Sequence, residues 1–303
     1  MIHTITVTNP QGDSLVMELA RPEESGFAVT GITGLGPSKA TINTTDIAMQ
    51  DGSFFNSAKC ESRNIVLSLR YMQSKGIENM RQLSYRYFPV KKKITLTVKT
   101  DNRELAIEGY VESNEPDIFS KDEGADISII CPYPYFYAVR DVIVAEFDQA
   151  DANFEFPFSN ESVTESVMEM SIMALYKERN VIYEGDADTG MTLTMHFTDA
   201  VKNVTLYNLQ TKEEMIIDTD KLSGIVGSSG LVAEDEIVIC TDRGSKSVTL
   251  IRDGVKTNIL NCLQKDADWL QLTKGDNLLG YKADEGVENI RFKIEGKVLY
   301  EGV

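Results

Sequence analysis

The sequence predicts a mainly β protein built from two β-sandwich domains with one short helix. Thr, Val, Ile and Tyr are plentiful, and Ala-rich helical runs are scarce, a bias that favours strands. Apolar residues recur at every second position in short segments, and Gly, Pro, Asn and Asp turns separate these segments. At residues 131–136, CPYPYF, two prolines remove ladder donors and end this alternation. We therefore expect domains at residues 1–138 and 139–303.

Length and charge set limits on the function. The chain has 303 residues, 42% of them apolar, which is enough to bury a core without disulfides. Its net charge of −17 is uneven: residues 1–140 hold 15 Lys and Arg against 17 Asp and Glu, and residues 141–303 hold 15 against 30. The acidic second half is unsuited to nucleic acid, which needs clustered cations. The near-neutral first half is the better candidate for packing against its own copies or other proteins.

The N-terminal half has a clear order of elements. The helix is predicted over residues 76–88, where Ile77, Met80, Leu83 and Tyr87 form one stripe and Pro89 ends it. A long hairpin is predicted from residues 49–62, which contain the turn Asp51-Gly52, together with residues 63–71. The other strands are expected at residues 2–7, 15–19, 27–32, 94–99, 103–114 and 125–131.

The C-terminal half repeats a rhythm of strand and turn. Lys274-Gly275-Asp276 and Asp253-Gly254 are expected to be turns, and residues 167–175 fit either a strand or a helix. The predicted strands are at residues 142–147, 192–197, 204–208, 215–217, 237–241, 247–252, 269–272, 290–294 and 298–300. Many short strands at regular spacing indicate a sandwich or a jelly roll.

Motifs for catalysis, metals and cofactors do not emerge from the sequence. His3 and His196 have no histidine partner at the spacing of a zinc helix, and the chain contains no GxSxG, GxGxxG or GxxxxGK[ST] pattern. Asp186-Ala187-Asp188-Thr189-Gly190 begins like a calcium loop, but the glycine comes one position early and Phe197 replaces the bidentate Glu. A solvated acidic turn is therefore favoured over a weak cation site. We expect no enzyme, no cofactor and no metal.

A few other residues have two interpretations each. The run from Lys91 to Lys93 is either a solvated strand entry or part of a charged channel lining. Trp269 is either a core residue or a platform for stacking a sugar. The four cysteines, at positions 60, 131, 240 and 262, are expected to be buried reduced thiols.

Phe54 and Phe55 are the candidate interface residues. They are adjacent aromatics beside a turn, so they point to opposite faces of a strand. Either both enter the sandwich core, or at least one is exposed in an isolated subunit and contacts a partner.

The N-terminus has no signal-peptide pattern, and no run of about 18 apolar residues is present. We therefore expect a protein made in a cytoplasm, without a membrane span.

Several segments in a fixed order resemble the siphophage-type distal tail protein family. In the first half they are Asp51-Gly52, RNIVL at 63–67, MRQL at 80–83, the three lysines, IEGYVE at 107–112, and SIICP at 128–132 with Tyr135-Phe136. In the second half they are DEIVICT at 235–241, DRG at 242–244, WLQL at 269–272, GDN at 275–277 and the closing YEGV at 300–303. The resemblance thus covers nearly the whole chain.

This resemblance implies a structural role in a tail tip. It implies a hexameric distal tail ring, with an N-terminal β-sandwich that carries a helix and a long hairpin. The tail-tube protein would meet one face of the ring, a tail-associated hub or lysin protein would meet the other, and DNA would pass through the channel. A galectin-like C-terminal sandwich would project outward and could hold receptor-binding proteins. The implied location is the virion tail tip, after assembly in the host cytoplasm.

An alternative is a carbohydrate-binding adhesin that recognises cell-wall sugars through the outer sandwich and Trp269. Galectin-like shape invites this alternative, although fold alone does not decide function. A wall hydrolase would need a carboxylate pair, and nothing in the sequence singles one out.

Overall fold

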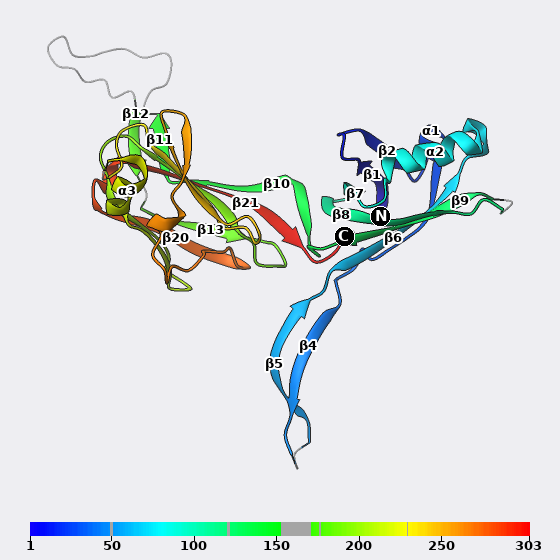
Figure 1. Ribbon diagram of the computed structural model, residues 1–303, viewed down its shortest axis with the longest axis horizontal. Coiled ribbons are helices and arrows are strands. Elements are labelled where there is room, and N and C mark those ends of the chain that lie inside the picture. Colours follow the sequence, from blue (N-terminus) through cyan, green and yellow to red (C-terminus); the bar gives the residue numbers. More distant parts are fainter. Residues whose placement is uncertain (49–50, 120–121, 153–170, 176, 229) are drawn as a thin grey trace, which may run out of the picture. The chain divides into compact units, whose positions relative to one another are not determined.

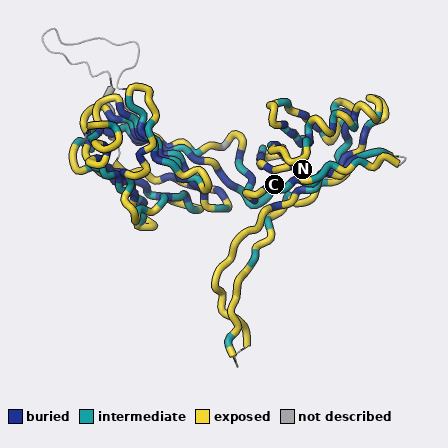
Figure 2. Tube along the Cα trace, in the orientation of Figure 1, coloured by how far each residue is buried: buried dark blue, intermediate teal, exposed yellow. Residues whose placement is uncertain are grey.

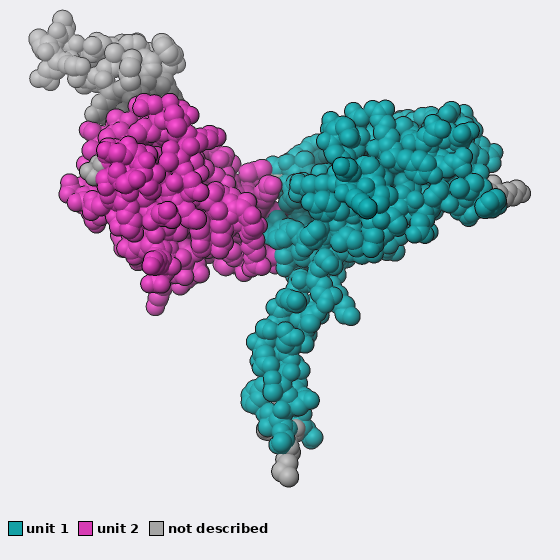
Figure 3. Space-filling view, viewed as in Figure 1, with its two compact units in different colours: residues 1–141, 299–303 teal, residues 142–298 magenta. Residues whose placement is uncertain are grey.

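The computed structural model describes residues 1–48, 51–119, 122–152, 171–175, 177–228 and 230–303. It divides the chain into two compact units (Figures 1 and 3). Unit 1 comprises Met1–Asp141 and Leu299–Val303, and unit 2 comprises Val142–Val298. The chain passes between the units twice, within strand β10 (Phe136–Glu146) and within strand β21 (Ile290–Tyr300).

Unit 1 is an antiparallel β structure with a helix. Its helical segments are α1 (Pro22–Ser25), η1 (Gln73–Lys75) and α2 (Ile77–Tyr87). Besides the start of β10, its strands are β1 (Ile2–Thr8), β2 (Ser14–Glu18), β3 (Phe27–Thr33), β4 (Ala40–Asp46), β5 (Ser53–Cys60), β6 (Arg63–Tyr71), β7 (Lys93–Thr100), β8 (Glu104–Pro116) and β9 (Gly124–Cys131).

The long strand β8 joins two sets of strands in unit 1. Its first part pairs with β7 and continues the order β8-β7-β1-β2, and its second part pairs with β9 and continues β9-β6-β3. Alternate residues of these strands are buried, among them Ile5, Leu67, Leu96, Ile107 and Ile129, each at most 1% exposed. The alternation of apolar and polar residues that predicted these strands therefore arises because one face of each strand is buried.

Helix α2 lies where the apolar stripe predicts it. Met80 and Ser84 are its buried residues, and Phe88, directly after it, is 1% exposed. The Phe88 backbone N–H donates to the Ser84 carbonyl at 2.8 Å, and Pro89 then prevents continuation.

The long hairpin exists, but the prediction paired the wrong strands. Strand β5 pairs with β4, on the other side of the Asp51-Gly52 turn. Strand β6 instead enters the main sheet between β3 and β9. The residues of β4, ATINTTD, are mostly polar, so the apolar alternation that marks a half-buried strand is weak there.

Unit 2 is also antiparallel. Besides the ends of β10 and β21, its strands are β11 (Asp148–Ala152), β12 (Ser171–Leu175), β13 (Glu178–Tyr183), β14 (Met191–Phe197), β15 (Lys202–Asn208), β16 (Glu213–Ile217), β17 (Glu236–Cys240), β18 (Ser247–Arg252), β19 (Val255–Asn258) and β20 (Gly275–Glu285). Its short helical segments are η2 (Thr219–Leu222), α3 (Ser223–Val226), η3 (Leu260–Cys262) and η4 (Val287–Asn289). The sequence left residues 167–175 open between strand and helix. Residues 171–175 form a strand, and residues 167–170 lie outside the described residues.

Two sheets pack against each other in unit 2. One has the order β19-β18-β17-β14-β21-β10 and the other the order β13-β20-β15-β16. The ring of Tyr281 in β20 lies 5.4 Å from the ring of Phe292 in β21, and Phe147 packs against both at 6.0 and 4.7 Å. These contacts join the two sheets through a shared aromatic core. The predicted mainly β, sandwich-type fold is therefore confirmed.

Two local predictions in unit 2 are wrong. Residues 269–272 form no strand; only Leu272 makes an isolated bridge, to Thr189. Leu270 and Leu272 are nevertheless buried, so the alternation of apolar residues reflects burial of a segment that is not paired as a strand. Gly275 begins the 11-residue strand β20 instead of ending a turn.

Residues Leu299–Val303, here called the C-terminal strap, lie with unit 1, although the sequence predicts them in the second domain. The Val303 N–H donates to the Leu35 carbonyl at 3.0 Å. The Arg63 guanidinium donates to the Glu301 carbonyl at 2.5 Å. These contacts attach the strap to the loop between β3 and β4 and to the start of β6.

Candidate functional site: the β4–β5 hairpin and its root

The β4–β5 hairpin is a two-stranded ribbon with a bulge. In its register Ile42 lies opposite Ala58, Asn43 opposite Ser57, and Thr44 opposite Phe55, so Asn56 is the extra residue. A bulge of this kind increases the twist of the ribbon and re-aims side chains. The Asn56 amide donates to Thr45 Oγ1 at 2.6 Å.

The register gives the hairpin two chemically different faces. Residues that lie opposite each other share a face, and neighbours along a strand alternate. One face, called the apolar face because it carries Ile42 and Phe55, consists of Ala40, Ile42, Thr44, Asp46, Ser53, Phe55, Ala58 and Cys60. The polar face consists of Thr41, Asn43, Thr45, Phe54, Asn56, Ser57 and Lys59.

Both candidate interface residues are exposed. Phe54 is 64% exposed, Phe55 is 66% and Ile42 is 62%, and all eight residues of β5 are exposed. Figure 2 shows this exposure along the hairpin. The alternative in which both phenylalanines enter the core is therefore wrong. Their part in an interface stays a prediction.

The hairpin has little of its own to stabilise it. Among the described residues, β4 and β5 pair only with each other, which leaves an open edge on each side. An isolated two-stranded hairpin is marginally stable in water. A contact with a partner would bury both the apolar face and an edge.

A buried arginine holds the root of the hairpin. Arg63 comes three residues after the end of β5 and is 4% exposed. Its Nη1 donates to the carbonyls of Gly34 at 2.7 Å and Gly36 at 2.5 Å, and its Nε donates to the Pro134 carbonyl at 2.8 Å. Its guanidinium also stacks on the Phe136 ring at 4.7 Å. Burial lowers the pKa of Arg63 from its ordinary value, and the carbonyl contacts compensate the buried charge.

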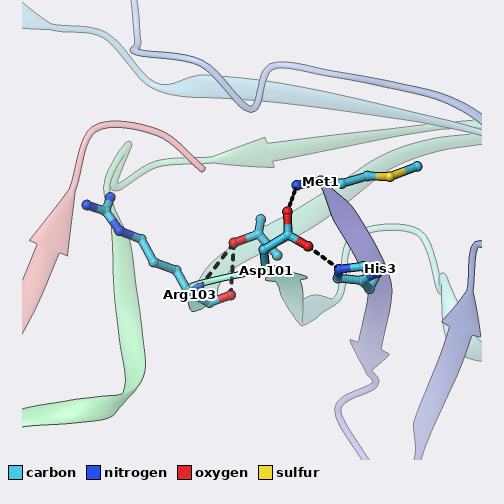
Figure 4. Close-up of polar contacts among 5 residues, drawn as sticks. Met1, His3, Asp101 and Arg103 are labelled. Carbon is cyan, nitrogen blue, oxygen red and sulfur yellow. Dashed lines mark hydrogen bonds and ion pairs between the residues drawn. The ribbon is translucent and has the colours of Figure 1, made fainter.

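A polar cluster lies at the turn between β7 and β8 (Figure 4). The Asp101 carboxylate accepts from the amino group of Met1 and lies 2.5 Å from His3 Nε2. The amino group and His3 hold the pKa of Asp101 below its ordinary value. The Thr100 N–H donates to the Arg103 carbonyl at 2.8 Å. His3 is thus a surface residue in an ion-pair network.

Trp269 is neither fully buried nor open. It is half-buried, and Lys246 Nζ lies 4.9 Å from the centre of its ring. Such a cation occupies one face of the ring. Stacking of a sugar on that face would require Lys246 to move.

The other residues singled out from the sequence have ordinary surroundings. His196 is half-buried in β14, and Lys274 Nζ lies 3.2 Å from Asp186 in the acidic turn. Lys91 and Lys92 are exposed in the turn before β7, and Lys93 pairs with Glu108 at 2.8 Å. Within the described ranges no group of three or more metal-ligating side chains occurs.

The cysteine prediction holds for only part of the set. All four cysteines are free; Cys131 and Cys262 are buried, Cys240 is half-buried and Cys60 is exposed. Cys60 is exposed because it is the last residue of β5, a strand that packs against no core. Burial raises the pKa of the Cys131 thiol to about 11.

Sequence reasoning missed two residues of the site. Ile42 lies in a Thr- and Asn-rich strand whose alternation is faint. Arg63 is the first residue of a strongly alternating strand, so the sequence indicates only a charged strand end. An arginine beside an apolar run, with glycines near the preceding strand, is only a weak signal that the arginine binds backbone carbonyls at the base of the hairpin.

The fold and site define a class of protein: two antiparallel β units, of which the first has a long hairpin with an unpartnered apolar face. Residues 184–295 match the family model described as siphovirus-type tail component, C-terminal domain. No curated protein sequence matches the chain.

Solved structures extend the similarity to the whole chain. The Dit (gp 19.1) protein of phage SPP1 is 12% identical, with coverage of 97% of this chain and 98% of that one and a TM-score of 0.65. A chain of the phage P2 baseplate, in its activated conformation with Ca, is 10% identical over 100% of both chains, with a TM-score of 0.52. The family match thus confirms the resemblance for residues 184–295, and the solved structures show that the fold is similar to that of SPP1 Dit along 97% of this chain.

Within the described residues, no helix has the length and hydrophobicity to cross a bilayer.

Proposed function

We propose that the protein is a non-enzymatic structural component of a phage or phage-derived tail tip. In this proposal it is one subunit of a hexameric distal tail ring that joins the tail tube to the baseplate hub. The observation that carries the proposal is the fold similarity along 97% of the chain to SPP1 Dit, whose structure is described as a paradigm of hub adsorption apparatus. The family match at residues 184–295 supports it independently.

Unit 1 would build the ring. Its near-neutral charge permits close packing of six copies, and the apolar face of the hairpin offers Ile42 and Phe55 to a neighbour. The tail-tube protein would dock on one face of the ring and a tail-associated hub or lysin protein on the other. DNA would only pass through the channel, since residues 1–140 carry slightly more acidic than basic side chains.

Unit 2 would lie at the outside of the ring and could hold receptor-binding proteins. Its acidic excess favours solubility and disfavours self-association. The protein would assemble in the host cytoplasm, end in the virion tail tip, and need no cofactor.

The test is assembly of the full chain. Negative-stain images and light scattering should show six-fold rings, for the protein alone or mixed with its tail-tube and hub proteins. Monomers only, under all of these mixtures, would overturn the ring.

A carbohydrate-binding adhesin is the second candidate, and Lys246 over the Trp269 ring argues against a free stacking platform. Calorimetry against host wall polysaccharide separates the two candidates. Sugar binding that Trp269→Ala abolishes would favour the adhesin, and absence of heat with the wild-type protein would remove it.

A further inference from the structure

The hairpin and the strap meet at one buried side chain. Arg63 begins β6 directly after the hairpin, and its donors reach Gly34 and Gly36 before the hairpin, as described above. A fourth hydrogen bond, from Nη2, goes to the Glu301 carbonyl of the strap. One guanidinium therefore bridges both arms of the hairpin and the C-terminal strap. Hydrogen bonds from a charged donor are stronger than neutral ones.

The strap is seated by contacts on each side of Glu301. The Val303 N–H donates to the Leu35 carbonyl at 3.0 Å. Gly302 approaches the same loop so closely that a Cβ atom would lie 3.0 Å from the Leu35 oxygen and 3.3 Å from the Gly36 carbonyl carbon. The Tyr300 ring stacks against the Arg103 guanidinium at 4.5 Å. A larger residue at position 302 would therefore press on the loop that the strap contacts.

The loop that the strap contacts is itself confined. Gly34 has φ +83, and a Cβ atom there would lie 2.2 Å from the Asn64 carbonyl oxygen. The loop is therefore pressed against the start of β6 on one side and contacted by the strap on another. Beyond this root, the hairpin is held by pairing between its own two strands.

From these contacts we propose that the C-terminal strap is a lock for the β4–β5 hairpin. When the strap is seated, Arg63 is fully engaged and the root loop is fixed, so the hairpin has a defined direction. When the strap is displaced, Arg63 loses one acceptor, the Leu35 contact is lost, and the hairpin pivots at residues 34–36. The lock concerns the isolated chain, so it stands or falls separately from ring assembly.

The first experiment is hydrogen–deuterium exchange of the full chain, followed by mass spectrometry. Gly302→Val should displace the strap and leave Arg63 in place. We expect exchange at residues 34–41 and 57–64 to rise about tenfold, because losing one charge-assisted hydrogen bond changes an opening equilibrium by at least that factor. Exchange in β7 and β14 should stay unchanged. Gly224→Val is the matched control, because a Cβ atom there meets nothing within 4 Å.

A second variant separates the strap carbonyl from the Glu301 side chain. Deletion of residues 301–303 should reproduce the Gly302→Val exchange pattern, whereas Glu301→Gln, which keeps the carbonyl, should match the wild type. Limited trypsin digestion gives an independent reading: cuts after Lys39 and Lys59 should accelerate about tenfold relative to the exposed Lys256 in β19.

Two results would overturn the lock. One is unchanged exchange at residues 34–41 and 57–64 in a folded Gly302→Val or deletion variant. The other is an equal rise in exchange throughout unit 1, which would show general destabilisation. Arg63→Lys, which keeps the charge but loses the planar fork, should raise exchange at the same segments. If that variant does not fold, the two strap variants decide the question.

Discussion

Two consecutive strands, β5 and β6, differ sharply in what surrounds them. Strand β5 (SFFNSAKC) has eight exposed residues and one partner strand. Strand β6 (RNIVLSLRY) starts three residues later, pairs on both edges, and buries every second residue from Arg63 to Tyr71. Both sequences contain large apolar residues, and only Glu61 and Ser62 separate them.

The difference shows that a segment can form a strand without being buried. Both segments form strands, but only β6 has a sheet to join, and so only its side chains contribute to the folding core. The apolar residues of β5 stay exposed in the subunit, and we propose that they contact a partner. The following predictions test this division.

The largest effect is expected in the core of β6. Leu67 is fully buried, so Leu67→Ala should lower the free energy of unfolding by about 2–5 kcal/mol, measured by denaturant titration. Ile42→Ala on the exposed hairpin is the matched control and should change it by less than about 0.5 kcal/mol. Equal losses would mean that the hairpin also packs into the core.

The thiols should differ by about 100-fold or more. The raised pKa of Cys131, about 11 against 9.0, reduces its thiolate by two orders of magnitude at pH 8, and burial restricts access further. Iodoacetamide should therefore modify Cys60 first, as read by peptide mass spectrometry. Cys60→Ser should remove this fast phase. Rapid labelling of Cys131 in the folded protein would contradict its burial.

The same pKa gives a stability trend at high pH. The raised folded pKa means that the Cys131 contribution is complete below the unfolded pKa of about 9.0 and declines as pH rises towards 11. Cys131→Ala should flatten this part of the pH profile of unfolding.

The hairpin aromatics should affect assembly more than folding. Phe54→Ser with Phe55→Ser should weaken ring formation about tenfold while the melting temperature of the monomer stays within a degree or two, since both side chains are exposed. Among the single variants, Phe55→Ser should weaken assembly more, because Phe55 shares the apolar face with Ile42. Sedimentation measures ring formation, and thermal unfolding followed by circular dichroism measures the melting temperature. Unchanged assembly of the double variant would remove the hairpin from the interface.

The smallest effect is expected at Asp101. The Met1 amino group and His3 lower its pKa, so its stabilising contribution is present above the ordinary carboxyl pKa of 3.8 and disappears as pH falls through the lowered value. Asp101→Asn should shift the melting temperature slightly at pH 7, and the difference should vanish in strong acid. A difference that persists in acid would assign the effect to something other than this ion pair.

Most strands could be predicted from the sequence because a half-buried strand has apolar residues at every second position, on its buried face. Residues 63–71 and 125–131 follow this rule, and their apolar positions are the buried ones. The rule failed for segments that are not half-buried strands. Strand β4 has no buried face, and Leu270 and Leu272 are buried although their segment is not paired in a sheet. The Asp51-Gly52 turn was recognised, but a turn signal does not name which strand precedes it.

The candidate site was predicted only in part. Phe54 and Phe55 were singled out as adjacent aromatics beside a turn, but their exposure depends on whether another sheet covers the hairpin. Arg63 could not be found, because its partners are backbone carbonyls, which any residue type provides. Its hydrogen-bond partners come from three segments, the farthest of which lies 238 residues from Arg63 in the sequence.

By itself, the sequence determined the mainly β composition, the helix at α2, the charge contrast between the halves and the absence of the searched catalytic motifs. These properties are local, since propensity, periodicity and charge act between near neighbours in the chain. Tertiary structure alone decided that β5 leaves the core while β6 joins it, that Phe55 shares a face with Ile42, and that residues 299–303 return to unit 1. Each of these depends on which segments distant in the sequence meet in the folded chain, and local residue patterns do not specify that choice.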